Sequence, residues 1–400
     1  MNQPLADIYK QDRLAGHFCR TQHTTEFRYA TSYLSESNPP LASTLPLSEA
    51  PLSYQAGALP PFFTGLLPEG RRLTTLRSSL KVSRDDELSL LLAVGSDTVG
   101  DVRVIKHGGT LPPDKDLEAR DIDPDNFKHI SFKELLSDQV YRDPASLPGV
   151  QEKVSGKMLT FPLRQGNDLY LLKLTPPEYP LLVENEAFFL KGAEGLKGRN
   201  GVVKSQLVFD GDGVSGLLVK RFDRGISPDG KIARYAVEDA CQLLNLYPAD
   251  KYDVSALEVS RAITGLVQQP VLAAQELLRQ FLYAWLTGNG DLHAKNLSVI
   301  TAGGKTRLSP VYDVPSTAPY GDQSMALKIL GKKRGLSARI FIEFGEQLGV
   351  RVPATTRLIR NTLADTEGLV EKAAELPFDS SRRKALVKVL QNRRLSLIQG

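Results

Sequence analysis

Cysteine is scarce in this sequence of 400 residues. Only Cys19 and Cys241 occur, and they lie far apart. This scarcity argues against a disulfide framework and against a metal site made of cysteines. We expect Cys241 to lie in the core.

Long apolar runs are also lacking. No stretch approaches the roughly 18 apolar residues that a membrane-spanning helix needs. Residues 1–16 have neither the apolar segment of a secretory signal nor the Arg-rich pattern of a transit peptide. We therefore expect a cytoplasmic protein that makes no membrane contact.

A strong excess of one charge is absent as well. The chain has 50 basic and 46 acidic residues, a net charge of +4, which permits an anionic partner but is not typical of a nucleic-acid-binding domain. Basic residues gather at 332–334 and near the C-terminus, where we interpret them as solvated helix faces. Hydrophobic residues at 41% and charged residues at 24% are ordinary values, which argues against disorder, a coiled coil or a collagen-like repeat.

The length predicts two or three domains. Residues 1–107 alternate short apolar runs with turn signals, which is typical of a small α+β subdomain. Residues 108–145 are rich in Pro, Asp and Lys and are predicted to be a linker region. Residues 146–224 are predicted to form a small lobe and residues 225–400 a helical lobe.

The first subdomain contains one unusual stretch, PPFFTGLLPEG at 60–70, which should be an ordered, packed loop because Pro and Gly disfavour a helix interior. A helix is predicted at 85–92, followed by a Gly-punctuated turn into a strand at 94–102. Residues 95–100 carry no Lys and no clear helix start, which argues against a phosphate-binding loop there.

Two hairpins are predicted in the small lobe. One pairs strands at 158–163 and 169–174, and the other pairs strands at 205–209 and 216–222 around the DGDG sequence. DGDG lacks the remaining ligands of a calcium loop, so we interpret it as a turn.

Lys173 lies inside an apolar strand, and alternation puts it on the same face as Leu169 and Leu171. A lysine in this position needs an anionic partner. Glu184 and Glu186, on a predicted helix that follows, are both candidates, and the residues alone do not choose between them.

Helical periodicity dominates after residue 225. Val237, Cys241 and Leu244 recur at helical spacing, and a longer apolar stripe from 274 to 286 places Trp285 in the core. Further helices are predicted at 337–348, 354–375 and 380–397.

The helix containing Trp285 leads directly into the polar sequence GNGDLHAKNLSVI at 288–300. Asp291 and Asn296 are five residues apart in it, and Asp313 follows a short strand-like stretch. Phosphoryl transfer needs such a set: one carboxylate that accepts the proton of the attacking hydroxyl, and an amide and a second carboxylate that bind magnesium. We expect His293 to be a structural histidine of this loop.

Several motifs together resemble the HipA-like serine/threonine kinases, the toxin components of bacterial type II toxin-antitoxin modules, over nearly the whole chain. The motifs are PFFTGLLPEG at 61–70, VGSDTVGDV at 94–102, GVQEK at 149–153, YLLKL at 170–174, ENE at 184–186, KRFDR at 220–224, GDLHAKN at 290–296 and SPVYD at 309–313. The resemblance implies an α+β, bilobed kinase-like fold with a β-rich N-terminal region and an all-helical C-terminal lobe.

The resemblance also implies roles for individual residues. Asp291 would be the catalytic base, Asn296 and Asp313 would bind Mg²⁺, and Ser146 would be an autophosphorylation site whose modification silences the enzyme. Pro148 departs from the small residue expected beside that serine and restricts φ there. The residues implied to bind ATP are Gly149, Val150, Gln151, Lys153, Lys173, Lys220 and Phe222.

The implied partners are a helix-turn-helix antitoxin, through which the protein would meet DNA, and a protein substrate such as an aminoacyl-tRNA synthetase. Two alternatives stay open at this point. One is a small-molecule or lipid kinase, because a DxHxxN loop is shared among kinase-like folds, and the other is a non-catalytic corepressor module.

Overall fold

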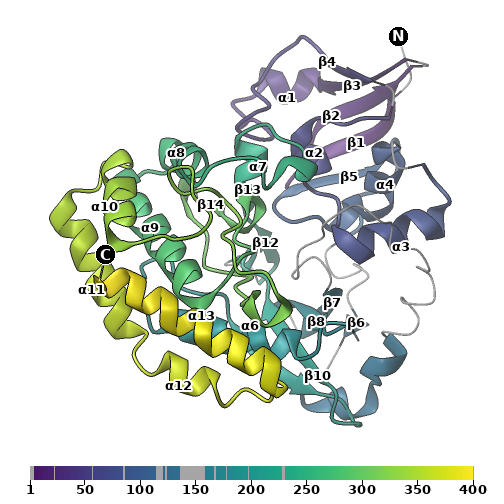
Figure 1. Ribbon diagram of the computed structural model, residues 1–400. Coiled ribbons are helices and arrows are strands. Elements are labelled where there is room, and N and C mark those ends of the chain that lie inside the picture. Colours follow the sequence, from purple (N-terminus) through teal and green to yellow (C-terminus); the bar gives the residue numbers. More distant parts are fainter. Residues whose placement is uncertain are drawn as a thin grey trace.

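The computed structural model describes residues 4–21, 23–55, 57–83, 86–113, 120–121, 124–135, 158–165, 168–176, 178–196, 198–227 and 230–399. Figure 1 shows an N-terminal sheet, a second sheet and a largely helical C-terminal lobe. The fold is therefore α+β, as predicted. Within the described ranges, no helix is long and apolar enough to cross a membrane.

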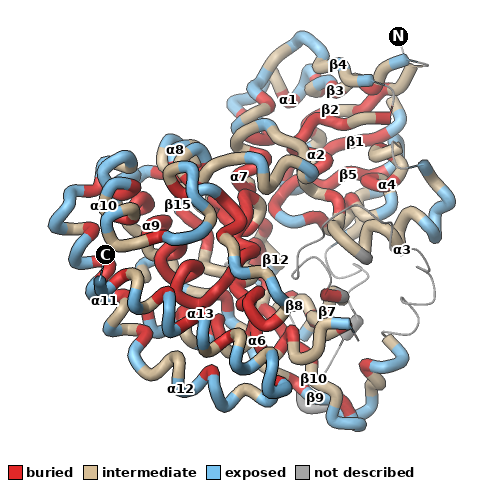
Figure 2. The backbone as a smooth tube through the Cα atoms, in the orientation of Figure 1, coloured by how far each residue is buried: buried red, intermediate tan, exposed pale blue. Residues whose placement is uncertain are grey.

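The N-terminal sheet has five antiparallel strands in the order β4-β3-β2-β1-β5. Phe18, Phe27 and Phe63 pack together at its centre, with ring centroids 4.8–5.9 Å apart. In Figure 2, buried residues run along β1, β2 and β5 of this sheet. The elements of this part are β1 Pro4–Lys10, β2 Arg13–Arg20, β3 Thr24–Tyr29, α1 Thr31–Ser35, β4 Leu52–Gln55, α2 Pro61–Thr64, α3 Gly70–Leu80, α4 Glu87–Val94, η1 Gly95–Asp97 and β5 Val102–Lys106.

The unusual stretch at 60–70 is packed as predicted, since Phe62 and Phe63 are buried. It nevertheless contains one helical turn, α2, because Pro61 occupies the first helical position, where its missing N–H costs nothing. The helix predicted at 85–92 begins at Glu87, where Asp86 accepts a hydrogen bond from the Ser89 amide, and continues to Val94.

The second sheet has the order β6-β7-β8-β10-β9, and helix α6 packs against β9 and β10. Both predicted hairpins are confirmed, since β7 pairs with β8 and β9 pairs with β10, all antiparallel. The elements are β6 Arg120–Asp121, η3 Pro124–His129, β7 Leu159–Gln165, β8 Asp168–Leu174, α6 Leu182–Glu194, β9 Ser205–Phe209 and β10 Ser215–Lys220.

Residues 120–121 and 124–135, which belong to the stretch predicted to be a linker at 108–145, contribute to this lobe. Strand β6 pairs with β7, and Phe127 and Phe132 are buried in the core of the sheet. These two isolated aromatic residues provide the apolar anchors that the polar composition of the stretch conceals. The DGDG sequence is a turn, as predicted, because Asp210 accepts hydrogen bonds from the amides of Asp212, Val214 and Phe132.

The C-terminal lobe packs around helix α9, whose residues Leu277, Leu278, Phe281 and Leu282 are fully buried. Trp285 is buried as predicted, and the guanidinium of Arg393 lies 4.2 Å from its ring centroid. Arg393 is thus an exception on the basic C-terminal helix, because it contacts the core rather than water. The helices are α7 Ala240–Leu243, η5 Pro248–Asp250, α8 Ala256–Leu266, α9 Pro270–Thr287, η6 Ala294–Asn296, η7 Ala318–Tyr320, α10 Ala338–Gln347, α11 Val352–Asp365, α12 Leu369–Ala373 and α13 Ser380–Gln399.

The prediction of an all-helical C-terminal lobe is wrong. This lobe contains a three-stranded sheet, β13-β14-β15, and a two-stranded sheet, β11-β12. Val237 lies in a strand, and a helix begins only after Asp239, whose side chain caps α7. The single helix predicted at 354–375 is interrupted at Gly368, whose φ of 73° lies in the left-handed region. The strands are β11 Arg224–Ile226, β12 Ile232–Arg234, β13 Ala236–Asp239, β14 Ser298–Ala302 and β15 Lys305–Leu308.

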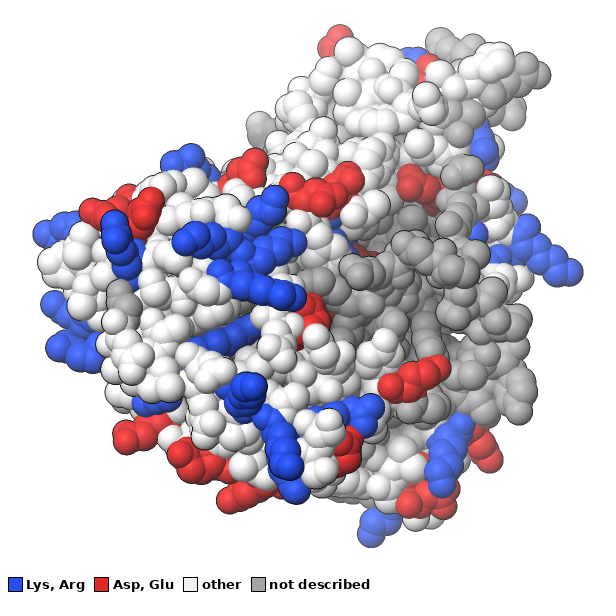
Figure 3. All heavy atoms as spheres, in the orientation of Figure 1, with Lys and Arg blue, Asp and Glu red and all other residues white. Residues whose placement is uncertain are grey.

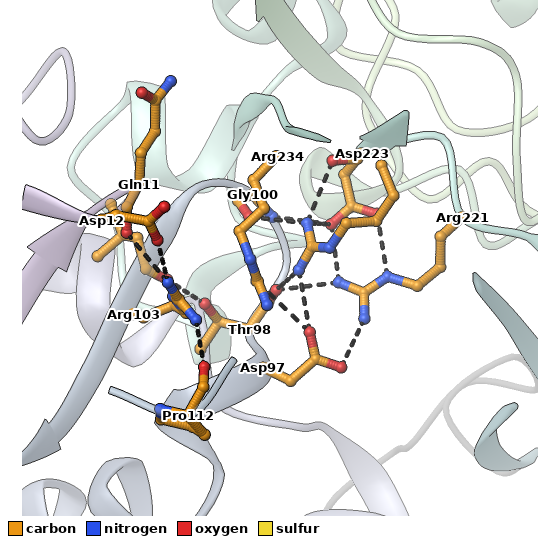
Figure 4. Close-up of polar contacts among 12 residues, drawn as sticks. Gln11, Asp12, Asp97, Thr98, Gly100, Arg103, Pro112, Arg221, Asp223 and Arg234 are labelled. Carbon is orange, nitrogen blue, oxygen red and sulfur yellow. Dashed lines mark hydrogen bonds and ion pairs between the residues drawn. The ribbon is translucent and has the colours of Figure 1, made fainter. Parts of the chain in front are cut away.

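Buried ion pairs join the segment between α4 and β5 to residues that follow β10 (Figure 4). The Arg221 guanidinium donates to Asp97 Oδ2 at 2.9 Å and to Asp223 at 2.8–3.0 Å, and Arg224 donates to Asp97 Oδ1 at 3.0 Å. The Gly100 amide donates to Asp223 Oδ2 at 2.9 Å. The 94–102 turn is therefore a structural contact between subdomains and not a phosphate loop.

Replacing Arg221 with alanine should lower the free energy of unfolding by up to about 3–5 kcal/mol, because Asp97 and Asp223 would each lose one of their buried arginine partners and keep Arg224. Chemical denaturation monitored by circular dichroism measures this change. Arg13→Ala is the control, since the Arg13 side chain is 69% exposed and pairs with Glu36 in water. Equal, small effects of the two substitutions would contradict the prediction.

Candidate functional site

Helix α9 positions the polar segment that carries Asp291. The helix ends at Thr287 and is capped by Gly288, whose φ is 70° and where an added Cβ would lie 3.0 Å from Ser316 Oγ. At Gly290 a Cβ would lie 2.5 Å from the Ser324 carbonyl oxygen. Glycine at both positions lets the chain turn sharply while staying packed against residues 316–324.

Backbone and amide hydrogen bonds fix the segment after this turn. The Asp291 amide donates to Asn289 Oδ1 at 2.8 Å, and Asn296 Nδ2 donates to the Asp291 carbonyl oxygen at 2.9 Å. Because the Asn296 nitrogen is used in this way, its Oδ1 is the atom with which it could bind a cation. Asp291 and Asn296, predicted as catalytic base and metal ligand, thus lie in one hydrogen-bonded turn.

Tyr252 contacts the Asp291 carboxylate directly and was not found by sequence reasoning. Its hydroxyl donates to Asp291 Oδ1 at 2.8 Å. Burial, together with the negative charge of Asp291, raises the pKa of Tyr252, so the phenol stays protonated and orients the carboxylate. No sequence motif points to this tyrosine, which lies 39 residues earlier in the chain.

His293 packs edge-on against the Tyr252 ring, with centroids 5.1 Å apart. Burial lowers the pKa of His293 below its ordinary value, even though the negative charge of Asp291 opposes this change. The imidazole is therefore neutral near pH 7. Its position within the turn agrees with the structural role expected for it.

Asp313 follows β15 and has a φ of 56°, in the left-handed region that aspartate tolerates better than most residues. Its Oδ1 lies 3.2 Å from Lys173 Nζ, on the small-lobe strand β8. Lys173 also donates to Glu186 at 2.7 and 3.0 Å. The structure thus selects Glu186, on α6, as the partner of the strand lysine, while Glu184 accepts a hydrogen bond from Ser215 Oγ.

Electrostatics keep this lysine charged. Burial by itself would lower the pKa of Lys173, but the attraction of Asp313 and Glu186 outweighs it and raises that pKa. For Glu186, burial raises the pKa above its ordinary value against the opposing attraction of Lys173. A permanent positive charge is therefore positioned beside Asp313, where it could contact an anionic group.

Lys295, within the same turn, attaches it to the N-terminal subdomain. Its Nζ lies 3.0 Å from the Gly65 carbonyl oxygen, 3.3 Å from Glu69 Oε1 and 3.0 Å from Asp239 Oδ2. Glu69 pairs with Lys251 too. The sequence indicated that residues 60–70 pack, but not that Glu69 and Gly65 contact the segment with Asp291.

Lys220 and Phe222, predicted to bind the cofactor, lie two residues apart, with Lys220 as the last residue of β10 and Phe222 after the end of the strand. Lys220 Nζ pairs with Asp168 at 2.6 Å, and the Phe222 ring stacks on Tyr312 with centroids 5.3 Å apart. The Tyr312 hydroxyl in turn donates to the Lys295 carbonyl oxygen at 2.8 Å. Phe222 therefore lies between the small lobe and the Asp313 segment, whereas Lys220 is engaged with Asp168.

The remaining predicted residues, Ser146, Gly149, Val150, Gln151 and Lys153, lie outside the described residues. The described part places the Asp291 carboxylate beside the Tyr252 hydroxyl, and the Asp313 carboxylate beside the Lys173 ammonium group. The Tyr312 hydroxyl, which donates to the Lys295 carbonyl oxygen, joins the Asp313 segment to the turn that contains Asn296. Carboxylate and amide oxygens are the ligands that Mg²⁺ prefers, and an ammonium group suits phosphate oxygens. Asn296, Asp313 and Lys173 therefore fit a magnesium nucleotide.

Comparison with known proteins gives two family models that match this chain. The model described as "HipA-like C-terminal domain" matches residues 145–372, and the model described as "HipA N-terminal domain" matches residues 6–105.

Similar proteins include the putative kinase Y4mE of Sinorhizobium fredii, which is 28% identical over 96% of each chain. A second putative kinase of that organism, Y4dM, is 31% identical over 77% of this chain and 74% of its own. The serine/threonine-protein kinase toxin HipA of Shewanella oneidensis is 29% identical over 78% of this chain and 75% of its own.

Among solved structures, the complex of HipA, HipB and operator DNA from Shewanella oneidensis contains a chain with a similar fold. The TM-score is 0.75 at 23% identity, and the match covers 98% of this chain and 97% of that chain. The likeness therefore extends across the N-terminal sheet, the second sheet and the C-terminal lobe.

The contact of Glu69 with Lys295 should make stability depend on pH. Burial by itself would raise the pKa of Glu69, but the positive charges of Lys295 and Lys251 outweigh it and lower that pKa from 4.5 to about 2. A lowered carboxyl pKa stabilises the folded state above the unfolded pKa, and this contribution is lost as the pH falls toward the folded one.

We therefore expect the wild type to unfold at a higher temperature than Glu69→Gln near pH 7, with the difference shrinking as the pH falls below about 4.5. Thermal unfolding of both proteins across this pH range measures the difference. A difference that stays constant down to the acid limit would contradict the assignment of these ion pairs.

Proposed function

The chain belongs to the HipA family, and on this basis we propose that it is a Mg-ATP-dependent protein serine/threonine kinase that acts as the toxin of a toxin-antitoxin pair. The observation that carries the proposal is the Lys173 contact to both Glu186 and Asp313, next to the turn that contains Asp291 and Asn296. The four positions with proposed roles in phosphoryl transfer, which are Lys173, Asp291, Asn296 and Asp313, all carry residues that are chemically competent for those roles.

In this proposal Asp291 accepts the proton of the substrate hydroxyl. Tyr252 donates to one of its carboxylate oxygens and so fixes the orientation of the group. The neutral His293 and the Asn289 contact keep the turn rigid, which limits the entropy lost when the reacting groups are aligned. Tyr252 is a positioning residue, since it acts through Asp291.

Asn296 Oδ1 and the Asp313 carboxylate would bind magnesium, and Lys173 would contact phosphate oxygens, with Glu186 holding its ammonium group in place. The bound ion would neutralise charge on the phosphates of ATP. Phe222, stacked on Tyr312 at the end of β10, would border the nucleotide base. Gly149, Val150, Gln151 and Lys153 are proposed to cover the phosphates, and Lys220 to line the same site.

Membership of the HipA family supports a proposal for the substrate class. We propose a protein serine or threonine, with an aminoacyl-tRNA synthetase as the leading type of substrate and Ser146 as a site of autophosphorylation. A phosphate on Ser146 would add a charge of about −1.5 to −2 beside a phosphate-binding loop, so repulsion would weaken ATP binding.

The proposed partner is a helix-turn-helix antitoxin that makes the DNA contacts. The related Shewanella oneidensis structure contains HipA together with HipB and operator DNA. On the face shown in Figure 3, Lys and Arg side chains of the C-terminal lobe lie among Asp and Glu side chains. This mixed face suits a protein that approaches DNA mainly through its partner.

Asp291→Asn should lower the rate of phosphate transfer by about 10²- to 10⁴-fold, because the proton acceptor is lost. Asp313→Asn should abolish transfer through loss of a metal ligand. Transfer of radiolabelled phosphate from ATP to lysate proteins measures both, and a metabolite extract as acceptor tests for a small-molecule kinase. Asp379→Asn is the control, because Asp379 is exposed and asparagine also caps a helix. Full activity of Asp291→Asn or Asp313→Asn would refute the assignment.

Nucleotide binding distinguishes the proposed role of Asp291 from that of Asp313. With Mg²⁺ present, ATP should raise the melting temperature of the wild type and of Asp291→Asn, but much less that of Asp313→Asn. Differential scanning fluorimetry with and without Mg²⁺ checks this expectation. A wild type that shows no Mg²⁺-dependent shift would favour a non-catalytic corepressor instead.

A further inference from the structure

A cluster of one carboxylate and two imidazoles lies on the N-terminal sheet, apart from the proposed kinase residues. Asp7 is on β1 and His17 is its direct cross-strand neighbour on β2. On the other side Asp7 pairs with Ile105 on β5, and His107 follows the end of that strand. His107 is 100 residues from Asp7 and 90 residues from His17 in the sequence, and the pairing of three adjacent strands brings the three side chains together.

The contacts within this cluster converge on a single oxygen. His17 Nδ1 and His107 Nδ1 each lie 2.7 Å from Asp7 Oδ1. The other carboxylate oxygen, Oδ2, accepts a hydrogen bond from the Gly108 amide at 2.9 Å. Asp7 is buried, whereas the side chains of His17 and His107 are 24% and 43% exposed. The Gly108 amide therefore holds one carboxylate oxygen, and the two partly exposed imidazoles contact the other.

The charge state of the carboxylate is suited to a cation. Burial would raise the pKa of Asp7, but hydrogen bonds from His107, Gly108 and His17 outweigh it and lower that pKa, so Asp7 is ionised at neutral pH. Nothing in the proposed phosphoryl transfer uses these three side chains. These three side chains lie on or next to β1, β2 and β5, outside the proposed kinase site.

We propose that Asp7, His17 and His107 form a binding site for one divalent transition-metal ion of the Zn²⁺ type. One potential ligand atom from each residue lies within 4.8 Å of the others. Two imidazole nitrogens and one carboxylate oxygen suit Zn²⁺, Ni²⁺ or Cu²⁺ better than Mg²⁺ or Ca²⁺, which prefer oxygen ligands only. The Gly108 amide orients the ligating carboxylate from the second oxygen, as outer partners do in known metal sites.

The geometry requires a small expansion. At metal–ligand distances of about 2.0–2.2 Å, tetrahedral ligand atoms lie about 3.3 Å apart, so the 2.7 Å contacts must lengthen by about 0.6 Å. Rotation of the partly exposed His107 and His17 side chains provides this movement. In each imidazole the nitrogen that binds the metal carries no proton, so Nδ1 would bind the ion and Nε2 would carry the ring proton.

A metal ion in this site would tie the end of β5 to the β1–β2 hairpin. The ion would bind the folded subdomain and not the unfolded chain, so it would raise the melting temperature. Three protein ligands also leave one position of a tetrahedral ion for water.

Titration of the full chain with Zn²⁺, followed by calorimetry in excess Mg²⁺, tests the proposal. Excess Mg²⁺ competes with Zn²⁺ for the oxygen ligands of the proposed nucleotide site, Asn296 and Asp313. We expect one saturable equivalent of Zn²⁺ on the wild type, and affinity lowered by more than about 10-fold in His17→Gln and in His107→Gln. Glutamine is chosen because it retains a hydrogen-bond donor to Asp7, so that the fold is preserved.

His23→Ala is the matched control, because His23 is an exposed histidine of the same subdomain. It should bind Zn²⁺ as the wild type does. Titration with Co²⁺ adds a second readout, since tetrahedral coordination gives visible absorption that the two glutamine variants should lose. Absence of saturable Zn²⁺ binding by the wild type, or binding that survives both glutamine substitutions, would show that the cluster is a hydrogen-bonded network only.

Discussion

The ion pairs of Lys173 connect three parts of the molecule at one atom. The lysine belongs to strand β8, Glu186 belongs to helix α6 and Asp313 belongs to the segment after β15. Moving three charges out of water costs several kcal/mol per ion, and only close mutual contacts offset that cost. The small-lobe sheet, helix α6 and the segment with Asp313 must therefore keep one relative arrangement, since a shift of any of them would leave a buried charge without its partner.

The N-terminal subdomain is subject to a similar constraint at two separate places. Asp97 and Gly100 contact the arginine and aspartate side chains that follow β10, and Glu69 and Gly65 contact Lys295 beside Asp291. Both contacts involve buried or partly buried charges, which tolerate little displacement. The first subdomain thus contacts both the residues that follow β10 and the turn that contains Asp291.

Much of this arrangement could be predicted from the sequence because it depends on local patterns. Strand alternation and turn residues predicted both small-lobe hairpins, and the apolar stripe at 274–286 predicted the core helix with Trp285. What could not be predicted depends on contacts between distant residues. The choice of Glu186 over Glu184, the hydroxyl of Tyr252 on Asp291 and the Glu69–Lys295 pair all follow from packing of separate elements. The strand at Val237 was mistaken for helix because three apolar residues at helical spacing do not reveal a strand partner, which here is the distant β14.

The backbone of Asp313 limits which sequences this fold can accept. With a φ of 56°, the position favours glycine, asparagine and aspartate, while β-branched residues are strongly disfavoured. The contact with Lys173 separately requires a negative charge on a short side chain. Glycine and asparagine satisfy the backbone without the charge, and glutamate supplies the charge without the same tolerance of left-handed backbone. Aspartate alone among the common amino acids meets both requirements, so backbone geometry and electrostatics together disfavour any other residue at this position.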